Sequence, residues 1–163
     1  MDAPRHFIDG AASIDQIPPE VFFGDCTVVD LRQEPDALLD IELASRYIGV
    51  KRLLLRTHHS FQEVDGVYQA HDRQLSPAAA SLLLESGLGL LGTDRLSVDD
   101  SEGRDYALHR QILGAGCVIL EGLFLPGVSP GDCFLYAAPL LLPGMEASPI
   151  RAFLIEKVLA RDY

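Results

Sequence analysis

An aspartate and a histidine near the start of the chain could bind a metal ion or transfer protons. They lie four residues apart in Asp2-Ala-Pro-Arg-His6, and Pro4 disfavours a helix between them. Residues four apart in extended backbone face the same side, so we expect Asp2 and His6 to point in one direction. Asp2 could bridge two cations, and a neutral His6 could ligate an ion or pass protons. The alternative is a pair of solvated side chains.

His109 and Glu121 form a second candidate pair. A predicted helix end, a Gly-Ala-Gly turn at 114–116 and a predicted strand separate them. This order of elements can return both side chains to one end of a sheet. A buried Glu121 among its apolar neighbours would need a partner, and a metal ion is one. The alternative is a surface histidine and a glutamate that merely ends a strand.

The elements that would position these residues follow from apolar runs and helix caps. The clearest helix begins with Ser76 as N-cap and Pro77 as its first residue, and it stops at Gly87. A second helix is predicted over 105–113. Short apolar runs predict strands at 27–31, 51–57, 88–94, 117–121, 133–138 and 151–156. Residues 1–25, with three prolines and two glycines, are predicted to extend and turn without forming a helix.

The order of these elements and the composition define the class of protein. Strands and helices alternate in the middle and strands dominate the end, which predicts an α/β fold with a mixed sheet. The 163 residues are 48% hydrophobic and 23% charged, typical of one globular domain. Cys26, Cys117 and Cys133 form no Cys-x-x-Cys pair, so we expect them to be buried and reduced.

The charge balance bears on partners and location. Thirteen Lys and Arg against 24 Asp and Glu give a net charge of -11, which repels phosphate backbones and anionic lipid. No apolar run approaches the roughly 18 residues of a membrane span, and the first residues lack the features of a signal peptide. We therefore expect no nucleic-acid or membrane partner and a cytoplasmic location.

Two motifs point to a known family. Met1-Asp-Ala-Pro-Arg-His6 matches the last six positions of the signature His-x-Gly-Thr-His-x-Asp-x-Pro-x-His. His109, followed twelve residues later by Glu121 in an apolar strand, matches a downstream pair of the same family. By these motifs the chain resembles the cyclase/arylformamidase family, which includes bacterial kynurenine formamidases and isatin hydrolases. Further matches extend over nearly the whole chain, at 29–31, 53–57, 92–94, Ser97, Asp99 and 138–140.

The resemblance implies a fold, a site and a reaction. The fold would be a swivelling β/α/β domain, with a mixed β-sheet or barrel flanked by helices. Asp2 and Glu121 would bridge two divalent ions, zinc or manganese, His109 would ligate the second ion, and His6 would be the general acid/base. The substrate would be a small amide, either an aryl formamide such as N-formylkynurenine or a cyclic amide, and metal-activated water would hydrolyse its C–N bond. Family members usually form dimers, so a homodimer is expected.

The sequence departs from the family pattern in one respect. The two His residues that open the signature, which would hold the first ion, are not in this sequence. Our hypothesis is that residues 1–163 form a single, N-terminally incomplete domain, with Met1 an internal methionine of a longer protein. One alternative is an inactive or non-catalytic family member with a partial metal site. Another is a structural partner of a different subunit.

Other polar residues are weaker candidates. His58, His59 and His71 fall in a predicted loop at 58–75 that could close over a site and contact substrate, or they could simply be solvated. Asp94, Ser97 and Asp99 match a family segment near the pocket, and turn formation is their alternative role.

Overall fold

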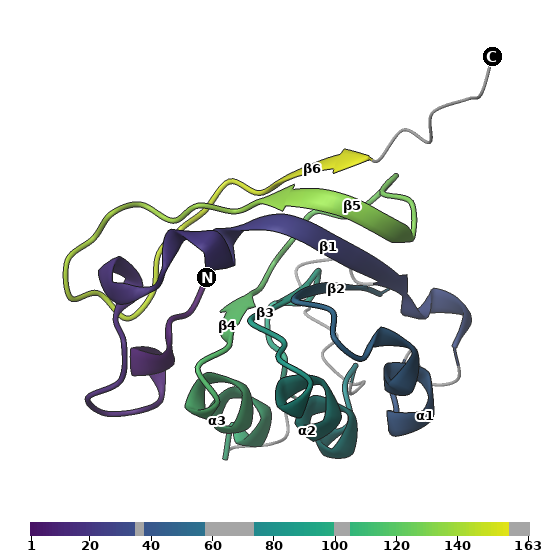
Figure 1. The fold of residues 1–163 in the computed structure, drawn as a ribbon, viewed down its shortest axis with the longest axis horizontal. Coiled ribbons are helices and arrows are strands. Elements are labelled where there is room, and N and C mark those ends of the chain that lie inside the picture. The colour runs from purple at the N-terminus through teal and green to yellow at the C-terminus, as the bar shows by residue number, and fades with distance from the viewer. Residues whose placement is uncertain (35–37, 58–73, 100–104, 157–163) are drawn as a thin grey trace, which may run out of the picture.

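The computed structural model describes residues 1–34, 38–57, 74–99 and 105–156, and its core is a single six-stranded sheet (Figure 1). The strand order is β4-β3-β2-β1-β5-β6. The strands are β1 (Phe23–Asp30), β2 (Arg52–Arg56), β3 (Leu90–Thr93), β4 (Val118–Leu120), β5 (Gly131–Tyr136) and β6 (Phe153–Glu156). Strands β1 to β4 are parallel, whereas β5 and β6 are antiparallel to their neighbours. The α/β fold with a mixed sheet is confirmed, and all six predicted strands are present.

Strand β1 begins four residues earlier than the sequence predicts. Its first residues are not a continuous apolar run, but they pair with β5, where Phe23 lies opposite Tyr136 and Asp25 opposite Phe134. Pairing with a strand more than a hundred residues away leaves no local pattern in the sequence.

Three helices cover one face of the sheet (Figure 1). They are α1 (Ile41–Ala44), α2 (Pro77–Glu85) and α3 (Ala107–Gly114). Helix α2 begins and ends as predicted: the Ser76 hydroxyl accepts from the Ala79 N–H, and Gly87, at φ +95°, donates its N–H to the Leu84 carbonyl. Helix α1, with only four residues, is too short to show a periodic pattern.

The N-terminal segment turns through short 3-10 helices. These are η1 (Pro4–His6), η2 (Ile14–Gln16) and η3 (Pro19–Phe22); η4 (Leu31–Gln33) and η6 (Ser45–Tyr47) follow later. Residues 1–25 contain no α-helix, but short 3-10 helices form in this segment, where only extended and turning backbone was predicted. The expectation of extended backbone from Asp2 to His6 is wrong, because Pro4 starts a turn in which its missing N–H costs nothing.

Alternating side chains on the strands divide the core into two layers. On β2, Leu53 and Leu55 pack under the helices, whereas Leu54 faces the opposite layer. That second layer is covered by apolar residues of the N-terminal segment, including Ile14 and Phe22. The three cysteines are free and buried, as expected.

The start of the chain extends the sheet beyond β4. Asp2 forms antiparallel bridges with Ile119 of β4 on one side and with Ala147 on the other. Its N–H donates to the Ile119 carbonyl at 2.8 Å, and the Ile119 N–H donates back at 3.2 Å. The backbone at Asp2 is therefore held between two segments that are far away in sequence. Within the ranges that the structure describes, no helix has the length and apolar character to cross a bilayer.

Candidate metal centre

Asp2, His109 and Glu121 come together at the end of β4. A carboxylate oxygen from each acid and a ring nitrogen of His109 all lie within 4.8 Å of one another. Each arrives on a different element: Asp2 along the edge of β4, Glu121 directly after β4, and His109 on α3. Since β3 and β4 are parallel, this is the carboxyl end of the strands, where open α/β sheets bind their ligands.

His109 is a buried imidazole with a carboxylate at each ring nitrogen. Its Nδ1 lies 2.5 Å from Oδ2 of Asp99, and its Nε2 lies 3.2 Å from Oε1 of Glu121. Burial by itself disfavours the charged ring, but the hydrogen bonds and negative charges of Asp99 and Glu121 outweigh it and raise the pKa of His109 to about 9. Without an ion, the imidazole carries a second proton and is positively charged at neutral pH. A divalent cation would take the place of that positive charge.

The two clustered acids favour a cation between them. Burial raises the pKa of Asp2, and the nearby charge of Glu121 raises it further, although the N-terminal amine, His6 and His109 act in the opposite direction. Glu121 is held in place because its Oε1 accepts the Val98 N–H at 2.8 Å. A partly buried carboxylate pair beside an imidazole offers the oxygen and nitrogen donors that zinc and manganese accept.

His6 lies beside this cluster and is not one of its three members. Its Nδ1 is 3.2 Å from Oε1 of Glu146, and about a third of its side chain is exposed, at 32%. It is near enough for its charge to lower the pKa of Asp2. The ring of Phe7 packs against both histidines, with its centroid 4.9 Å from that of His6 and 4.8 Å from that of His109.

Three contacts of the site were absent from the sequence-based prediction. Asp99 received no role there, yet it binds His109; Glu146 pairs with His6; and Phe7 packs on His109. Asp99 is part of a segment that matches the family near its pocket, so the sequence indicated that Asp99 could lie close to the site. The contacts of Glu146 and Phe7 depend on how distant segments pack.

The remaining candidates have other surroundings. Asp94 is buried and accepts the N–H and hydroxyl of Thr57 at 2.9 and 2.8 Å, which ties the end of β2 to the end of β3. The Ser97 hydroxyl accepts the Asp99 N–H at 3.2 Å. His58, His59 and His71 lie outside the described residues.

Glu121 also lines a cavity of about 570 Å³ on the sheet face opposite the helices. Its walls are mainly apolar and include Leu54, Leu123 and Phe124. Arg151 is the one cation among the described residues that line it. The cavity therefore joins an apolar wall to one of the clustered carboxylates.

Comparisons with known proteins give consistent results. The Cyclase family model matches residues 1–100. The kynurenine formamidase of Sphingopyxis alaskensis is 35% identical over 162 residues, which cover 95% of this chain and 74% of that protein. The kynurenine formamidase of Bacillus cereus is 35% identical over 155 residues, covering 93% and 72%. A solved structure described as a potential metal-dependent hydrolase with cyclase activity superposes with a TM-score of 0.82 at 28% identity, covering 97% of this chain and 77% of that one.

Proposed function

This chain belongs to the cyclase family, and we propose that it is a metal-dependent hydrolase of a non-peptide carbon–nitrogen bond. The observation that carries the proposal is the convergence of Asp2, His109 and Glu121. Three protein ligands with a coordination position left for water are typical of catalytic metal sites. Its similarity to two kynurenine formamidases supports an aryl formamide as substrate, with a small cyclic amide as the related choice.

Each residue has a distinct part in the proposed reaction. Nε2 of His109 and one oxygen each from Asp2 and Glu121 would hold a zinc or manganese ion, and the two carboxylates would share a second ion where one is present. The bound metal would lower the pKa of water and polarise the substrate carbonyl. The contact of His6 Nδ1 with Glu146 leaves Nε2 of His6 to transfer a proton to the leaving amine.

The cavity beside Glu121 supports an aromatic substrate. Its apolar walls would remove an aryl ring from water, and Arg151 would pair with a substrate carboxylate. We propose that the reacting carbonyl lies at the Glu121 end and the ring lies along the apolar wall.

Metal binding and hydrolysis test the proposal together. The chelator-treated chain would be titrated with Zn²⁺ and Mn²⁺ and assayed with N-formylkynurenine, formanilide and isatin. We expect Asp2→Asn, His109→Gln and Glu121→Gln each to weaken metal binding at least tenfold and to abolish hydrolysis. His6→Gln should keep the metal and lose turnover. Glu85→Gln, an exposed acid on α2, is the matched control and should behave as wild type.

Two results would count against the proposal in different ways. If the wild-type chain binds neither Zn²⁺ nor Mn²⁺, the proposed metal site is wrong. A chain that binds metal through these three residues and hydrolyses none of the compounds would favour the second candidate, a non-catalytic member with a partial site. That candidate would use Asp2, His109 and Glu121 to hold an ion without turnover.

A further inference from the structure

A carboxylate outside the three proposed ligands controls how one of them faces the site. We infer that Asp99 is a positioning residue, which fixes the orientation and the tautomer of His109 so that Nε2 is the nitrogen available to an ion. The inference rests on the proposed function, because it assigns Asp99 a role toward that metal site.

The contacts of Asp99 leave His109 little freedom. Oδ2 of Asp99 lies 2.5 Å from Nδ1 of His109, and the two side chains are 8% and 5% exposed. An ionised carboxylate only accepts hydrogen bonds, and both ring nitrogens face one; the much shorter contact, with Asp99, is the one that keeps its hydrogen when the ring is neutral, so Nδ1 donates. In a neutral imidazole the lone pair is then on Nε2, the nitrogen that faces Glu121 at 3.2 Å. Such carboxylate–histidine pairs orient the ring and raise its basicity toward a metal.

Asp99 is itself anchored by the helix that carries His109. Its Oδ1 accepts the Leu108 N–H at 2.8 Å, and its Oδ2 accepts the His109 N–H at 3.0 Å. These are the second and third residues of α3, whose N-cap residue Tyr106 makes no side-chain cap. One carboxylate thus caps the helix and holds the ring that the helix presents.

The substitution Asp99→Asn separates the two roles of this carboxylate. An amide has one acceptor oxygen and one donor group, so it cannot accept all three N–H groups. Whichever way the neutral amide faces, it attracts the Nδ1 hydrogen less strongly than the charged carboxylate of Glu121 attracts a hydrogen on Nε2. The hydrogen of the neutral ring should therefore move to Nε2, which blocks the ligand nitrogen. Helix capping by the remaining oxygen is retained in part.

The matched control is Asp40→Asn. Asp40 caps α1 by accepting the Leu43 N–H at 2.9 Å, and its hydrogen bonds within the described residues involve no histidine. Both variants remove one charge from a helix-capping aspartate. A purely structural role for Asp99 would make the two behave alike.

The test measures Zn²⁺ affinity by calorimetry and the ring state of His109 by ¹⁵N NMR, with circular dichroism to confirm folding. We expect wild type to show hydrogen on Nδ1, in the zinc-bound ring or in the metal-free neutral ring above pH 9. Asp99→Asn should lose 10- to 100-fold in Zn²⁺ affinity and gain hydrogen on Nε2 in the metal-free neutral ring. Asp40→Asn should keep the Zn²⁺ affinity of wild type and the hydrogen on Nδ1 of His109.

The possible outcomes separate this inference from the proposed function. If wild type binds no zinc, the proposed function fails, while the neutral ring still reports whether Asp99 selects the tautomer. A wild-type ring with hydrogen on Nε2 overturns the inference, even if Asp99→Asn does not fold. Equal losses of zinc affinity in Asp99→Asn and Asp40→Asn would also overturn it.

Discussion

The imidazole of His109 can bind either a second proton or a metal ion. Its side chain is 5% exposed, and its two nitrogens face Asp99 and Glu121. Both carboxylates stabilise positive charge on or next to the ring, whichever cation supplies it. The protonated, metal-free site is therefore a stable arrangement, and an ion must displace the proton to bind.

The stability of the metal-free protein should fall as the pH rises. The pKa of His109 is about 9 in the folded chain and near its ordinary value of 6.5 in the unfolded chain. A raised pKa contributes stability that is complete below pH 6.5 and is lost as the pH rises through about 9. The difference corresponds to about 3 kcal/mol. Urea unfolding at pH 6 and pH 9.5 in the presence of a chelator measures it.

His109→Gln provides the comparison for this pH effect, because the variant has no imidazole at this position. We expect its stability to change less between the two pH values than that of wild type. With saturating Zn²⁺ the trend in wild type should reverse, since removal of the proton favours the ion. Equal pH dependence in wild type and His109→Gln would contradict the assignment.

The proximity of His109 and Glu121 could be predicted from the sequence, whereas the contacts that hold His109 in place could not. The order of elements between His109 and Glu121 predicted a shared end of the sheet, and the two side chains meet there. The link from Asp99 to His109 depends on the path of the chain between β3 and α3. No spacing rule gives the contact of Asp99 with His109, which was visible only in the structure.

Among the elements, β3 shows how closely the strands pack against the layer opposite the helices. Gly92 of β3 lies under Leu54 of β2 and near Leu123. A Cβ at position 92 would clash with Leu54 and would lie 2.9 Å from Cδ1 of Leu123. Leu54 is 1% exposed and belongs to this packed layer, so its side chain would have to shift to admit the new Cβ.

The substitution Gly92→Ala should therefore destabilise the fold by about 1–3 kcal/mol, the usual cost of overpacking a core. Thermal or urea unfolding measures the loss. Gly89→Ala is the matched control, because its Cβ would meet only the Lys51 carbonyl oxygen, at an ordinary 3.7 Å. A near-neutral Gly92→Ala would mean that Leu54 can repack.

The predicted elements differ from the observed ones mainly where distant contacts decide. Caps within the sequence predicted α2 correctly, since Ser76 and Gly87 lie next to the helix they bound. Helix α3 begins at Ala107, two residues later than predicted, because Asp99 caps it from outside. Local signals thus identified the elements, and tertiary contacts set several of their ends.

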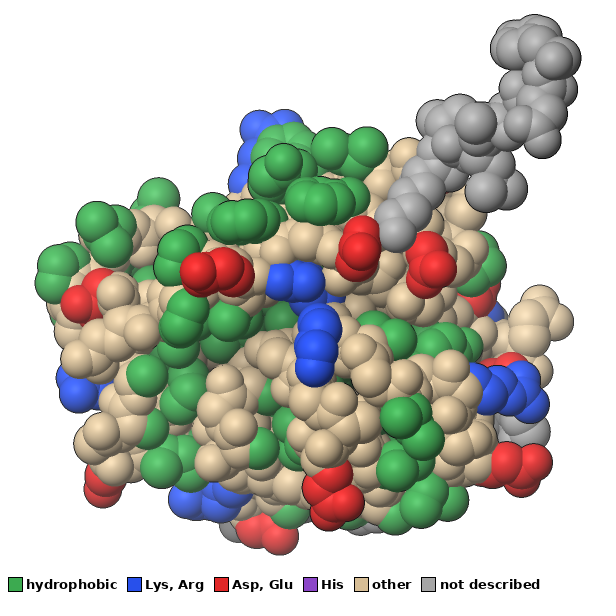
Figure 2. All heavy atoms as spheres, in the orientation of Figure 1, with side chains coloured by type: hydrophobic (Ala, Val, Ile, Leu, Met, Phe, Trp, Pro, Cys, Tyr) green, Lys and Arg blue, Asp and Glu red, His purple; other side chains and the backbone are tan. Residues whose placement is uncertain are grey.

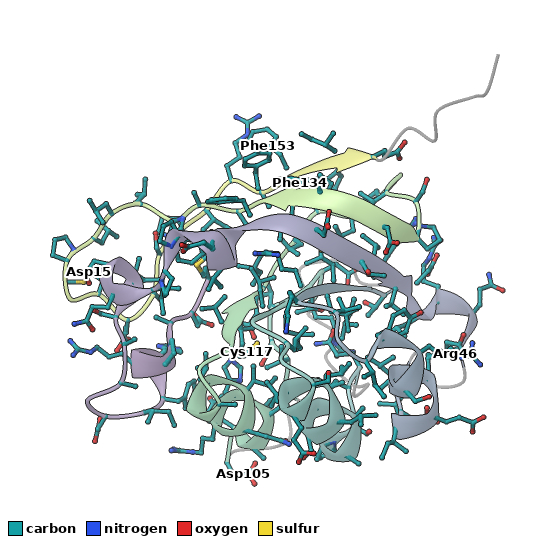
Figure 3. All side chains as sticks on the ribbon, in the orientation of Figure 1. Asp15, Arg46, Asp105, Cys117, Phe134 and Phe153 are labelled. Carbon is teal, nitrogen blue, oxygen red and sulfur yellow. The ribbon has the colours of Figure 1, made fainter. Side chains whose placement is uncertain are left out.

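At the scale of the whole molecule, the outer strands present an exposed apolar face. Phe23 of β1, Tyr136 of β5, and Phe153 and Ile155 of β6 are 40–55% exposed. The pairing of β1 with β5 and of β5 with β6 places these side chains on one face, where Phe23 stacks on Tyr136 with ring centroids 6.2 Å apart. Hydrophobic side chains gather over β5 and β6 in Figure 2, and Figure 3 shows Phe134 and Phe153 there. An apolar patch of this kind is typical of an interaction surface.

We expect this face to be buried in the homodimer that the sequence analysis predicts. Phe153→Asp would place a charge in the interface and should weaken dimerisation at least tenfold. Leu141→Asp, at a residue 80% exposed and outside β5 and β6, should leave the dimer intact. Sedimentation velocity over a concentration series measures both. A wild-type chain that stays monomeric would contradict this prediction.

The bridges of Asp2 to Ile119 and Ala147 have a consequence for the order of folding. The Met1 amine also donates to the Ser148 carbonyl, 147 residues along the chain. Closing so long a loop is slow compared with pairing neighbouring strands, so β1, β2 and β3 can assemble first. During synthesis, Asp2 cannot complete both bridges until Ala147 has left the ribosome. Ion uptake requires Asp2 to reach the end of β4, so a zinc-sensitive probe would report only molecules in which the start of the chain has met that strand.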